Sequence, residues 1–175
     1  MTETIVAATS DADYRAFGLL IREYWQWLRT RYAAQSGSID AIGSHQGIDD
    51  ELQELSTVYG PPRGRTLLAV RDGQVIGAVA YRDMGDGACE MKRLFVPERY
   101  QGGGIGRALC EALIATAATD GYLLMRLDTG TGNTEALAMY ASLGFAACPP
   151  FHDYPTELMV NLLFLERPLF ADSGA

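Results

Sequence analysis

The stretch 89–107, CEMKRLFVPERYQGGGIGR, constrains the fold of this chain more than any other. Residues 89–96 are mostly apolar or favourable to β structure, and Pro97 cannot donate to a strand ladder, so we predict a strand that ends there. Glycine occupies four of the five positions from 102 to 106, and glycine takes positive φ and lets the backbone approach another molecule closely. From Ile105 onward the apolar residues follow a helical period. The stretch therefore predicts a strand, a glycine-rich turn and a helix.

Such a turn presents free N–H groups at a helix N-terminus, which favours a bound anion, most often phosphate. It is not the nucleoside-triphosphate loop, which requires Gly-Lys-Ser/Thr, because Gly106 is followed by Arg107 and Ala108. It is not the dinucleotide motif Gly-x-Gly-x-x-Gly either, because the sixth position counted from Gly102 is Arg107. A turn that closes a strand–helix unit without any ligand is the alternative interpretation.

The length of 175 residues predicts a single domain, residues 1–175, with a proper core. Hydrophobic residues make up 48% and charged residues 21%, as in soluble globular proteins. No apolar run approaches the ~20 residues of a membrane span, and the N-terminal sequence lacks the basic start and apolar core of a signal peptide. These features predict a cytoplasmic protein without a membrane partner.

The two histidines, His45 and His152, are far apart, and the three cysteines lack metal-ligand spacing. We therefore expect reduced thiols and no metal site. The net charge of −8 argues against a nucleic-acid partner, whose phosphates require a basic face. It mildly favours an amine substrate, although solubility alone also explains it. Positive potential for an anionic cofactor would come from Lys92, Arg93, Arg99 and Arg107.

The N-terminal part is predicted to contain one strand and two helices. Residues 4–8 form the strand, and a helix over about residues 11–28 follows because its apolar residues recur at helical spacing. Residues 33–47 are small and polar and are predicted to form a loop, and residues 48–55 a short helix.

Two groups in this part have alternative interpretations. Trp25 and Trp27 lie at or beyond the edge of the apolar stripe, where they line a pocket or a dimer face or are partly covered surface. The short helix carries the carboxylates Asp49, Asp50, Glu51 and Glu54. They receive the ammonium group of a substrate, or they form a solvated face that suits the helix dipole.

The rest of the chain predicts a mixed sheet. Three strands with tight turns are antiparallel neighbours, and a strand–helix–strand crossover then makes one parallel pair. A helix capped by Asn133 ends at Gly144, and two more strands follow. The predicted ranges are strands 66–71, 74–83, 89–96, 122–128, 145–148 and 158–166, with helices 104–119 and 133–143.

Several segments, in this order and spacing, resemble the GNAT superfamily of acetyl-CoA-dependent N-acetyltransferases. Gln101, Gly104 and Gly106 match its Gln/Arg-x-x-Gly-x-Gly motif, and residues 133–145 match its Asn-x(6)-Tyr-x-x-x-Gly-Phe segment. The resemblance covers about residues 4–168. It implies an α+β, three-layer fold with a mixed, mostly antiparallel sheet of six to seven strands, flanking helices and one splayed parallel pair.

The resemblance also implies where acetyl-CoA binds. In such enzymes the pantetheine arm pairs with exposed backbone between the splayed strands, as an added strand would. A bulge near residues 93–94 would set the splay. The backbone of Leu94, Phe95 and Val96 would hold the arm, and the pyrophosphate would lie on the N–H groups of Gly102, Gly103, Gly104, Ile105, Gly106 and Arg107, with further contacts from Gln101, Asn133 and Tyr140.

Two residues match the catalytic positions of the family. Tyr140 would protonate the leaving thiolate, since a phenol is protonated at neutral pH; a tyrosine that only packs in the core is the alternative. Glu90 would remove the amine proton through water, with a pKa raised by half-burial. The alternative for Glu90 is an ion pair with Lys92, Arg82 or Arg126 on the sheet face.

The sequence thus predicts an N-acetyltransferase that transfers acetyl from acetyl-CoA to a primary amine of a small molecule by direct attack on the thioester. Acylation of a protein N-terminus or lysine is one alternative. A non-catalytic, acyl-CoA-binding module of the same fold is another. The last strand offers an edge for a homodimer.

Overall fold

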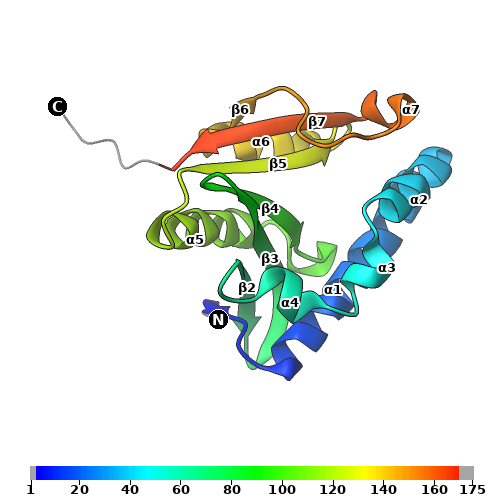
Figure 1. The fold of residues 1–175 in the computed structure, drawn as a ribbon. Coiled ribbons are helices and arrows are strands. Elements are labelled where there is room, and N and C mark those ends of the chain that lie inside the picture. Colours follow the sequence, from blue (N-terminus) through cyan, green and yellow to red (C-terminus); the bar gives the residue numbers. More distant parts are fainter. Residues whose placement is uncertain (1–2, 170–175) are drawn as a thin grey trace.

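The computed structural model describes residues 3–169. Over these residues it forms a seven-stranded sheet of order β1-β2-β3-β4-β5-β7-β6, in which β4 and β5 are parallel and the other neighbours antiparallel (Figure 1). The strands are β1 (Thr4–Ala7), β2 (Gly64–Arg71), β3 (Gln74–Gly85), β4 (Ala88–Phe95), β5 (Leu124–Gly130), β6 (Ala146–Ala147) and β7 (Leu162–Pro168). This confirms the predicted mixed sheet and its single parallel pair.

Helices cover both faces of the sheet, which makes three layers. They are α1 (Asp11–Arg31), α2 (Ser36–His45), α3 (Ile48–Glu51), α4 (Leu55–Tyr59), α5 (Ile105–Thr119), α6 (Thr134–Ser142) and α7 (Thr156–Met159), with 3-10 turns η1 (Ala33–Gln35) and η2 (Glu98–Tyr100). Helix α1 begins with a capping box, because Ser10 accepts from the Asp13 N–H and Asp13 accepts from the Ser10 N–H. Within residues 3–169, no helix combines the length and apolar character of a membrane span.

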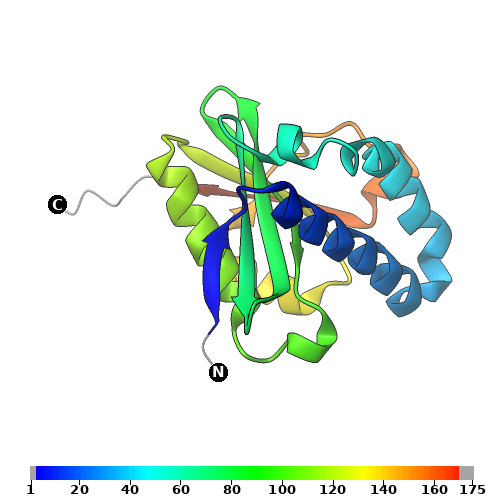
Figure 2. The same ribbon diagram turned by 90° about the horizontal axis from the view of Figure 1, so that it is seen from below.

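Two hydrophobic cores lie on the two faces. One core joins α5 and α6 to the sheet and includes Leu109, Leu113 and Met125. The other joins α1, α2 and α4 to the opposite face and includes Phe17 and Ile21. Figure 2 shows α5 and α1 on opposite sides of the central strands. The apolar stripe of α1 therefore packs on the sheet, as its spacing predicts.

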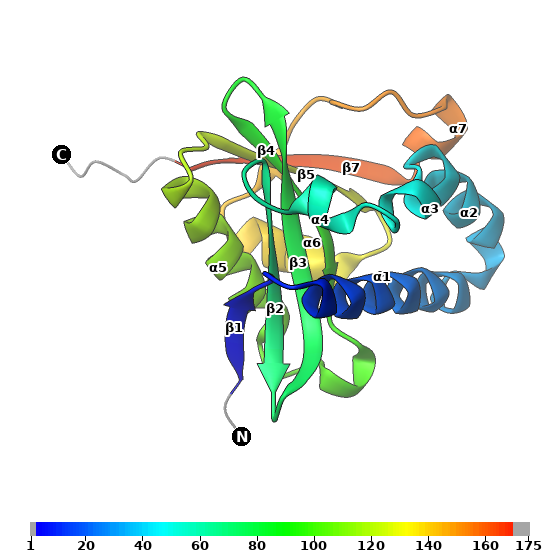
Figure 3. The same cartoon turned by 60° about the horizontal axis from the view of Figure 1, so that its bottom comes forward.

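The parallel strands β4 and β5 are paired over a short length only. The ladder consists of Ala88↔Leu124, Cys89↔Met125 and Glu90↔Arg126, although both strands continue. Figure 3 shows β5 and β7 running across the direction of β2 and β3. The chain thus forms a sheet in two parts, joined at one end of β4 and open at the other.

A bulge in β4 accompanies this opening. Ala78 pairs with Phe95 and Ala80 with Lys92, so β4 has one extra residue opposite β3. Arg93 has φ of 60°, an uncommon value for a residue that is not glycine. The bulge predicted near residues 93–94 is confirmed, and it bends the strand where the ladder to β5 has ended.

Three predicted elements differ from the structure. Residues 33–47 contain η1 and α2 rather than a loop, the predicted helix 48–55 is divided into α3 and α4, and α7 precedes a last strand that begins at Leu162. In α2, Ile39 is buried, and a Cβ placed on Gly43 would lie 3.4 Å from the Trp25 ring. Tertiary packing against α1 therefore stabilises a helix that its small, polar sequence does not indicate.

Leu109 and Leu19 test this packing with the same substitution in two helices. Leu109 of α5 is 0% exposed and Leu19 of α1 is 69% exposed. We expect Leu109→Ala to lower the free energy of unfolding by about 2–5 kcal/mol, because it leaves a cavity in the core. Leu19→Ala should change it by less than ~0.5 kcal/mol. Urea denaturation measures both values, and equal losses would contradict the assignment of α5 as the core helix.

Candidate active site

A cavity of about 840 Å³ lies in the opening between β4 and β5. Its walls come from α1, α2, β4, the glycine-rich turn, β5 and α6. All residues predicted to bind the cofactor border it except Gly103. Tyr140 of α6 is among them. Glu90, the other predicted catalytic residue, does not border the cavity. The fold therefore brings together predicted cofactor-binding residues that are up to 46 positions apart, from Leu94 to Tyr140.

The glycine-rich turn forms a cradle of unpaired backbone donors, defined here as the N–H groups of residues 102–107. Within the described chain these groups donate to no protein acceptor, and the first backbone bond of α5 is from the Ala108 N–H to the Gly104 carbonyl. Gly102 and Gly104 have φ of 85° and 80°, which glycine adopts without strain. These orphan donors at a helix N-terminus suit the pyrophosphate of acetyl-CoA.

The backbone of β4 beyond Glu90 has no strand partner on its β5 side within the described residues. Leu94, Phe95 and Val96 line the cavity there, which fits the predicted exposed edge. One group of this edge is already satisfied, because the Gln101 side-chain amide donates to the Val96 carbonyl at 2.7 Å. Gln101 thus fixes the turn relative to the strand, in addition to bordering the cavity.

Tyr140 lies on α6 at the floor of the cavity, and its ring packs edge-on against Phe145 with centroids 5.7 Å apart. Within residues 3–169 its hydroxyl makes no hydrogen bond. Burial raises the pKa of Tyr140 well above the usual value, and the neighbouring Cys110 and Tyr24 contribute. The phenol is therefore protonated at neutral pH and has a proton available for a ligand in the cavity.

Asn133 occupies the N-cap position of α6, as predicted, but its side chain makes no capping hydrogen bond. That side chain borders the cavity and is available to a ligand. The cations that were expected to supply positive potential at the cradle are paired with carboxylates in the structure. Arg107 contacts Glu111 at 3.2 Å, and Arg99 contacts Glu23. The cradle thus offers backbone dipoles more than free positive charge.

Glu90 is fully buried, with an exposed fraction of 0%. Arg82 contacts it at 2.8 Å, Lys92 at 3.3 Å and the His152 Nε2 atom at 2.7 Å. Burial alone acts to raise its pKa, but the hydrogen bond from His152 and the charges of Lys92 and Arg82 outweigh it and lower the pKa of Glu90 well below its usual range. The prediction of a half-buried carboxyl with a raised pKa is therefore wrong. The predicted ion pairs with Lys92 and Arg82 are confirmed, whereas Arg126 contacts Glu166 instead.

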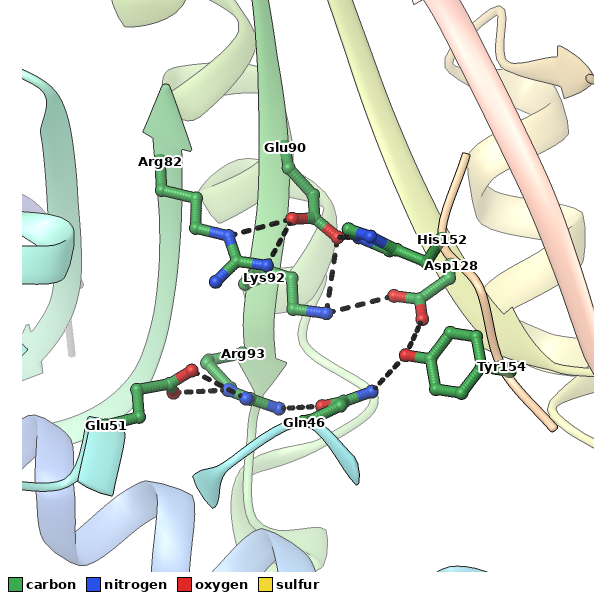
Figure 4. Close-up of polar contacts among 9 residues, drawn as sticks. All are labelled: Gln46, Glu51, Arg82, Glu90, Lys92, Arg93, Asp128, His152 and Tyr154. Carbon is green, nitrogen blue, oxygen red and sulfur yellow. Dashed lines mark hydrogen bonds and ion pairs between the residues drawn. The ribbon is translucent and has the colours of Figure 1, made fainter. Parts of the chain in front are cut away.

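Polar side chains continue from Glu90 across the opening to α3 (Figure 4). Lys92 also contacts Asp128 of β5 at 3.1 Å, and Tyr154 donates to Asp128 at 2.7 Å. Gln46 joins Tyr154 to Arg93, which holds Glu51 through two hydrogen bonds. We call Glu90, Lys92, Asp128, Tyr154, Gln46, Arg93 and Glu51 the polar chain; Arg82 and His152 contact it at Glu90.

The carboxylates predicted to receive a substrate ammonium do not form such a site. Asp49, Asp50 and Glu54 are exposed and line no part of the large cavity, and Glu51 is neutralised by Arg93. His152, the third partner of Glu90, was not predicted. His152 lies in a loop without a recognisable motif, so the sequence contained no signal for it.

Trp25 and Trp27 both line the cavity, which agrees with the first of their predicted interpretations. Trp27 stacks on Tyr24 with centroids 6.2 Å apart and donates to Glu98 at 2.7 Å. Trp25 and Ile39 form a further apolar wall from α1 and α2. This wall comes from helices that contribute nothing to the cradle of residues 102–107.

An unpaired donor cradle beside a split parallel pair is the arrangement that acetyl-CoA-dependent N-acetyltransferases use for their cofactor. The comparisons with known proteins agree. Residues 21–145 match the Acetyltransferase (GNAT) family, and the chain belongs to this family and is an N-acetyltransferase.

Similar proteins span nearly the whole chain. An uncharacterized N-acetyltransferase of Schizosaccharomyces pombe is 34% identical over 91% of this chain and 92% of its own length. A protein named IAA acetyltransferase, of Azospirillum brasilense, is 34% identical over 86% of this chain and 88% of its own length. The structure of the PaiA N-acetyltransferase of Thermoplasma acidophilum in complex with coenzyme A has a TM-score of 0.69 at 19% identity, covering 96% of this chain and 99% of that one, which shows the common fold.

Gly104→Ala and Gly103→Ala test the conformation of the cradle. Neither added Cβ would meet an atom within 4 Å, but only Gly104 has positive φ. We expect Gly104→Ala to lower the free energy of unfolding by about 1–2 kcal/mol, because an L-residue is strained in that conformation, and to weaken acetyl-CoA binding. Gly103→Ala should have little effect on stability. Urea denaturation and calorimetry measure the two quantities, and identical behaviour of the variants would contradict the described turn.

Glu90→Gln tests the charge balance in the opening. Since the folded-state pKa of Glu90 is lowered, its ionisation stabilises the fold above the pKa of the unfolded chain, and that stability is lost as the pH falls through the folded-state value. We expect Glu90→Gln to cost about 3–5 kcal/mol at pH 7, because it removes the buried carboxylate that Arg82 and Lys92 both contact. The difference from wild type should shrink as the pH falls below about 4.

The matched control is Glu166→Gln, which breaks a half-exposed pair with Arg126. It should cost only about 0–1 kcal/mol. Urea denaturation between pH 3 and 7, which spans about the usual carboxyl range, measures both variants. A difference for Glu90→Gln that stays constant over this range would contradict the lowered pKa.

Proposed function

We propose that this enzyme transfers the acetyl group of acetyl-CoA to a primary amine of a small molecule by direct attack of the amine on the thioester. The observation that carries the proposal is the cradle of residues 102–107, in which unpaired N–H groups lie beside the unpaired edge of β4. A diphosphate and an extended amide-containing arm together match these two features. The pyrophosphate would lie on the cradle and the arm along Leu94, Phe95 and Val96.

The chemistry requires a neutral amine, a donor to the oxyanion and a proton for the leaving thiolate. Tyr140 is the proposed acid, because its protonated hydroxyl borders the cavity without a protein acceptor within the described residues. The unpaired backbone of β4 near the bulge is a source of the oxyanion donor. Positioning the amine against the thioester would supply much of the remaining acceleration.

A small-molecule acceptor is favoured by the shape of the cavity. We assign the acceptor to the end of the cavity that α1 and α2 wall. Trp25 and Ile39 line one side of this end, and the polar chain lines the other. A protein N-terminus or lysine needs a groove that is open along the surface, and such acceptors fit less well at an end that two helices and the polar chain wall. The amine itself is to be identified by a screen of small amines with acetyl-CoA that detects the released thiol.

Tyr140→Phe tests the proposed acid. We expect it to lower kcat about 10²-fold or more, because it removes the proton donor to the thiolate, with little change in the Kd of acetyl-CoA. Tyr122→Phe is the control, since Tyr122 does not line the cavity. Thiol release measures kcat and calorimetry measures Kd.

Two outcomes would contradict the proposal at different points. An unchanged kcat in Tyr140→Phe would remove Tyr140 from the mechanism. Tight binding of acetyl-CoA by the wild type without thiol release for any amine would instead favour a binding module of the same fold.

A further inference from the structure

His152 contacts the buried carboxylate of Glu90 from a loop that neither the sequence motif nor the family match includes. The match ends at residue 145, and His152 follows in the segment between β6 and α7. Its Nε2 atom lies 2.7 Å from the Glu90 Oε1 atom, while its side chain is 28% exposed. Glu90 is thus inaccessible to solvent, whereas the imidazole beside it is partly exposed.

The protonation of Glu90 determines which nitrogen of His152 carries hydrogen. Glu90 is ionised at neutral pH, because Arg82, Lys92 and His152 lower its pKa, and an ionised carboxylate only accepts hydrogen bonds. The Nε2 atom of His152 must therefore be the donor. In the neutral imidazole the Nδ1 atom then has a free lone pair, and within the described chain it has no hydrogen-bond partner.

A small cavity of about 160 Å³ lies next to the large one and borders His152. His152 lines the small cavity, and Gln46, Lys92 and Arg93 line both. The two spaces thus adjoin at the polar chain. An acceptor amine at this junction would have the large cavity on one side and His152 on the other.

We propose that His152 is the catalytic base that takes a proton from the acceptor at this junction, directly or through one water molecule, and that Glu90 is the positioning residue that orients it. This proposal rests on the proposed acetyl transfer. It assigns the base to an imidazole and not to the glutamate of β4. A carboxylate that holds the base in one tautomer and stabilises its protonated form is a known arrangement in other enzymes.

The protons and bonds balance as follows. A primary ammonium loses one proton to the His152 Nδ1 atom, which frees the lone pair of its nitrogen. The N–C bond to the acetyl carbon forms and the C–S bond breaks, and Tyr140 gives its proton to the leaving sulfur. The nitrogen loses its second proton, which replaces that of Tyr140, and His152 releases its own to solvent.

The charged and titratable groups around His152 come from every neighbouring element. Glu90 and Lys92 of β4 and Arg82 of β3 face it, and Arg126 of β5 lies over the Phe151 ring that packs against it. The remaining groups at the small cavity are His45, Glu51, Arg93, Asp153 and Tyr154. Lys92 is paired with both Glu90 and Asp128, and Arg93 with Glu51, so the cations nearest the junction are neutralised.

The test is the pH dependence of kcat/KM in His152→Gln and His152→Asn. These amides still donate a hydrogen bond to Glu90 but cannot accept a proton in this pH range. We expect a loss of about 10²–10⁴-fold at pH 7, loss of the acidic limb of the wild-type profile, and recovery as the pH approaches the pKa of the free amine. Added imidazole should restore part of the rate in His152→Ala.

Two further variants separate the roles of the groups. Glu90→Gln should move the acidic limb to lower pH, because it removes a negative charge that favours the imidazolium. His45→Gln removes the other histidine at the small cavity, and the acidic limb should remain. Acetyl-CoA affinity, measured by calorimetry, should be preserved in the His152 variants and shows that they are folded.

Specific outcomes would overturn the proposal. If His152→Gln keeps the wild-type acidic limb, or loses rate equally at all pH values without imidazole rescue of His152→Ala, His152 is only structural. If the wild type transfers acetyl to no amine, the proposed function fails before this inference is reached. If the wild type transfers acetyl and the His152 variants keep its pH profile of kcat/KM, this inference fails while the proposed function stands.

Discussion

The structure depends on the incomplete pairing of β4 and β5. Two parallel strands normally continue their ladder for as long as both are extended, and here the ladder stops after Glu90 and Arg126. The bulge at Arg93 bends β4, so that the strand follows β3 and leaves β5. The core around Leu109 and Met125 contains residues from both parts of the sheet and holds them in this relation. The resulting opening supplies both the cavity and an edge of unpaired backbone.

An opening in a sheet requires polar groups that tolerate burial, and the polar chain supplies them. Three carboxylates, Glu90, Asp128 and Glu51, alternate with Lys92 and Arg93, while Arg82 adds a third cation. Burial acts to raise the pKa of Asp128, but Lys92 and Tyr154 lower it, and the same balance applies to Glu90. Charge pairing of this kind leaves few unpaired ions, which would otherwise be costly. It also leaves His152 in contact with a fixed negative charge.

The sequence predicted the local structure of the cradle well and the surroundings of Glu90 poorly. The cradle is a local structure, in which Pro97, the glycines and the helix that begins at Ile105 determine one another, so residues 97–107 suffice to predict it. Tyr140 was found through a second local motif. The pKa of Glu90, in contrast, depends on Arg82 and His152, from positions eight before and 62 after it. No local pattern contains that information.

The sequence by itself determined the succession of strands, the anion cradle and the apolar faces of the two long helices, because these depend on residue spacing and backbone preference within a few turns of chain. Only the tertiary structure decided that residues 36–45 are helical, that the carboxylates of the short helix do not face the large cavity, and that Glu90 is ionised and bound to His152. Burial and charge at a position are set by whatever packs around it, and in this fold those neighbours come from distant strands and loops.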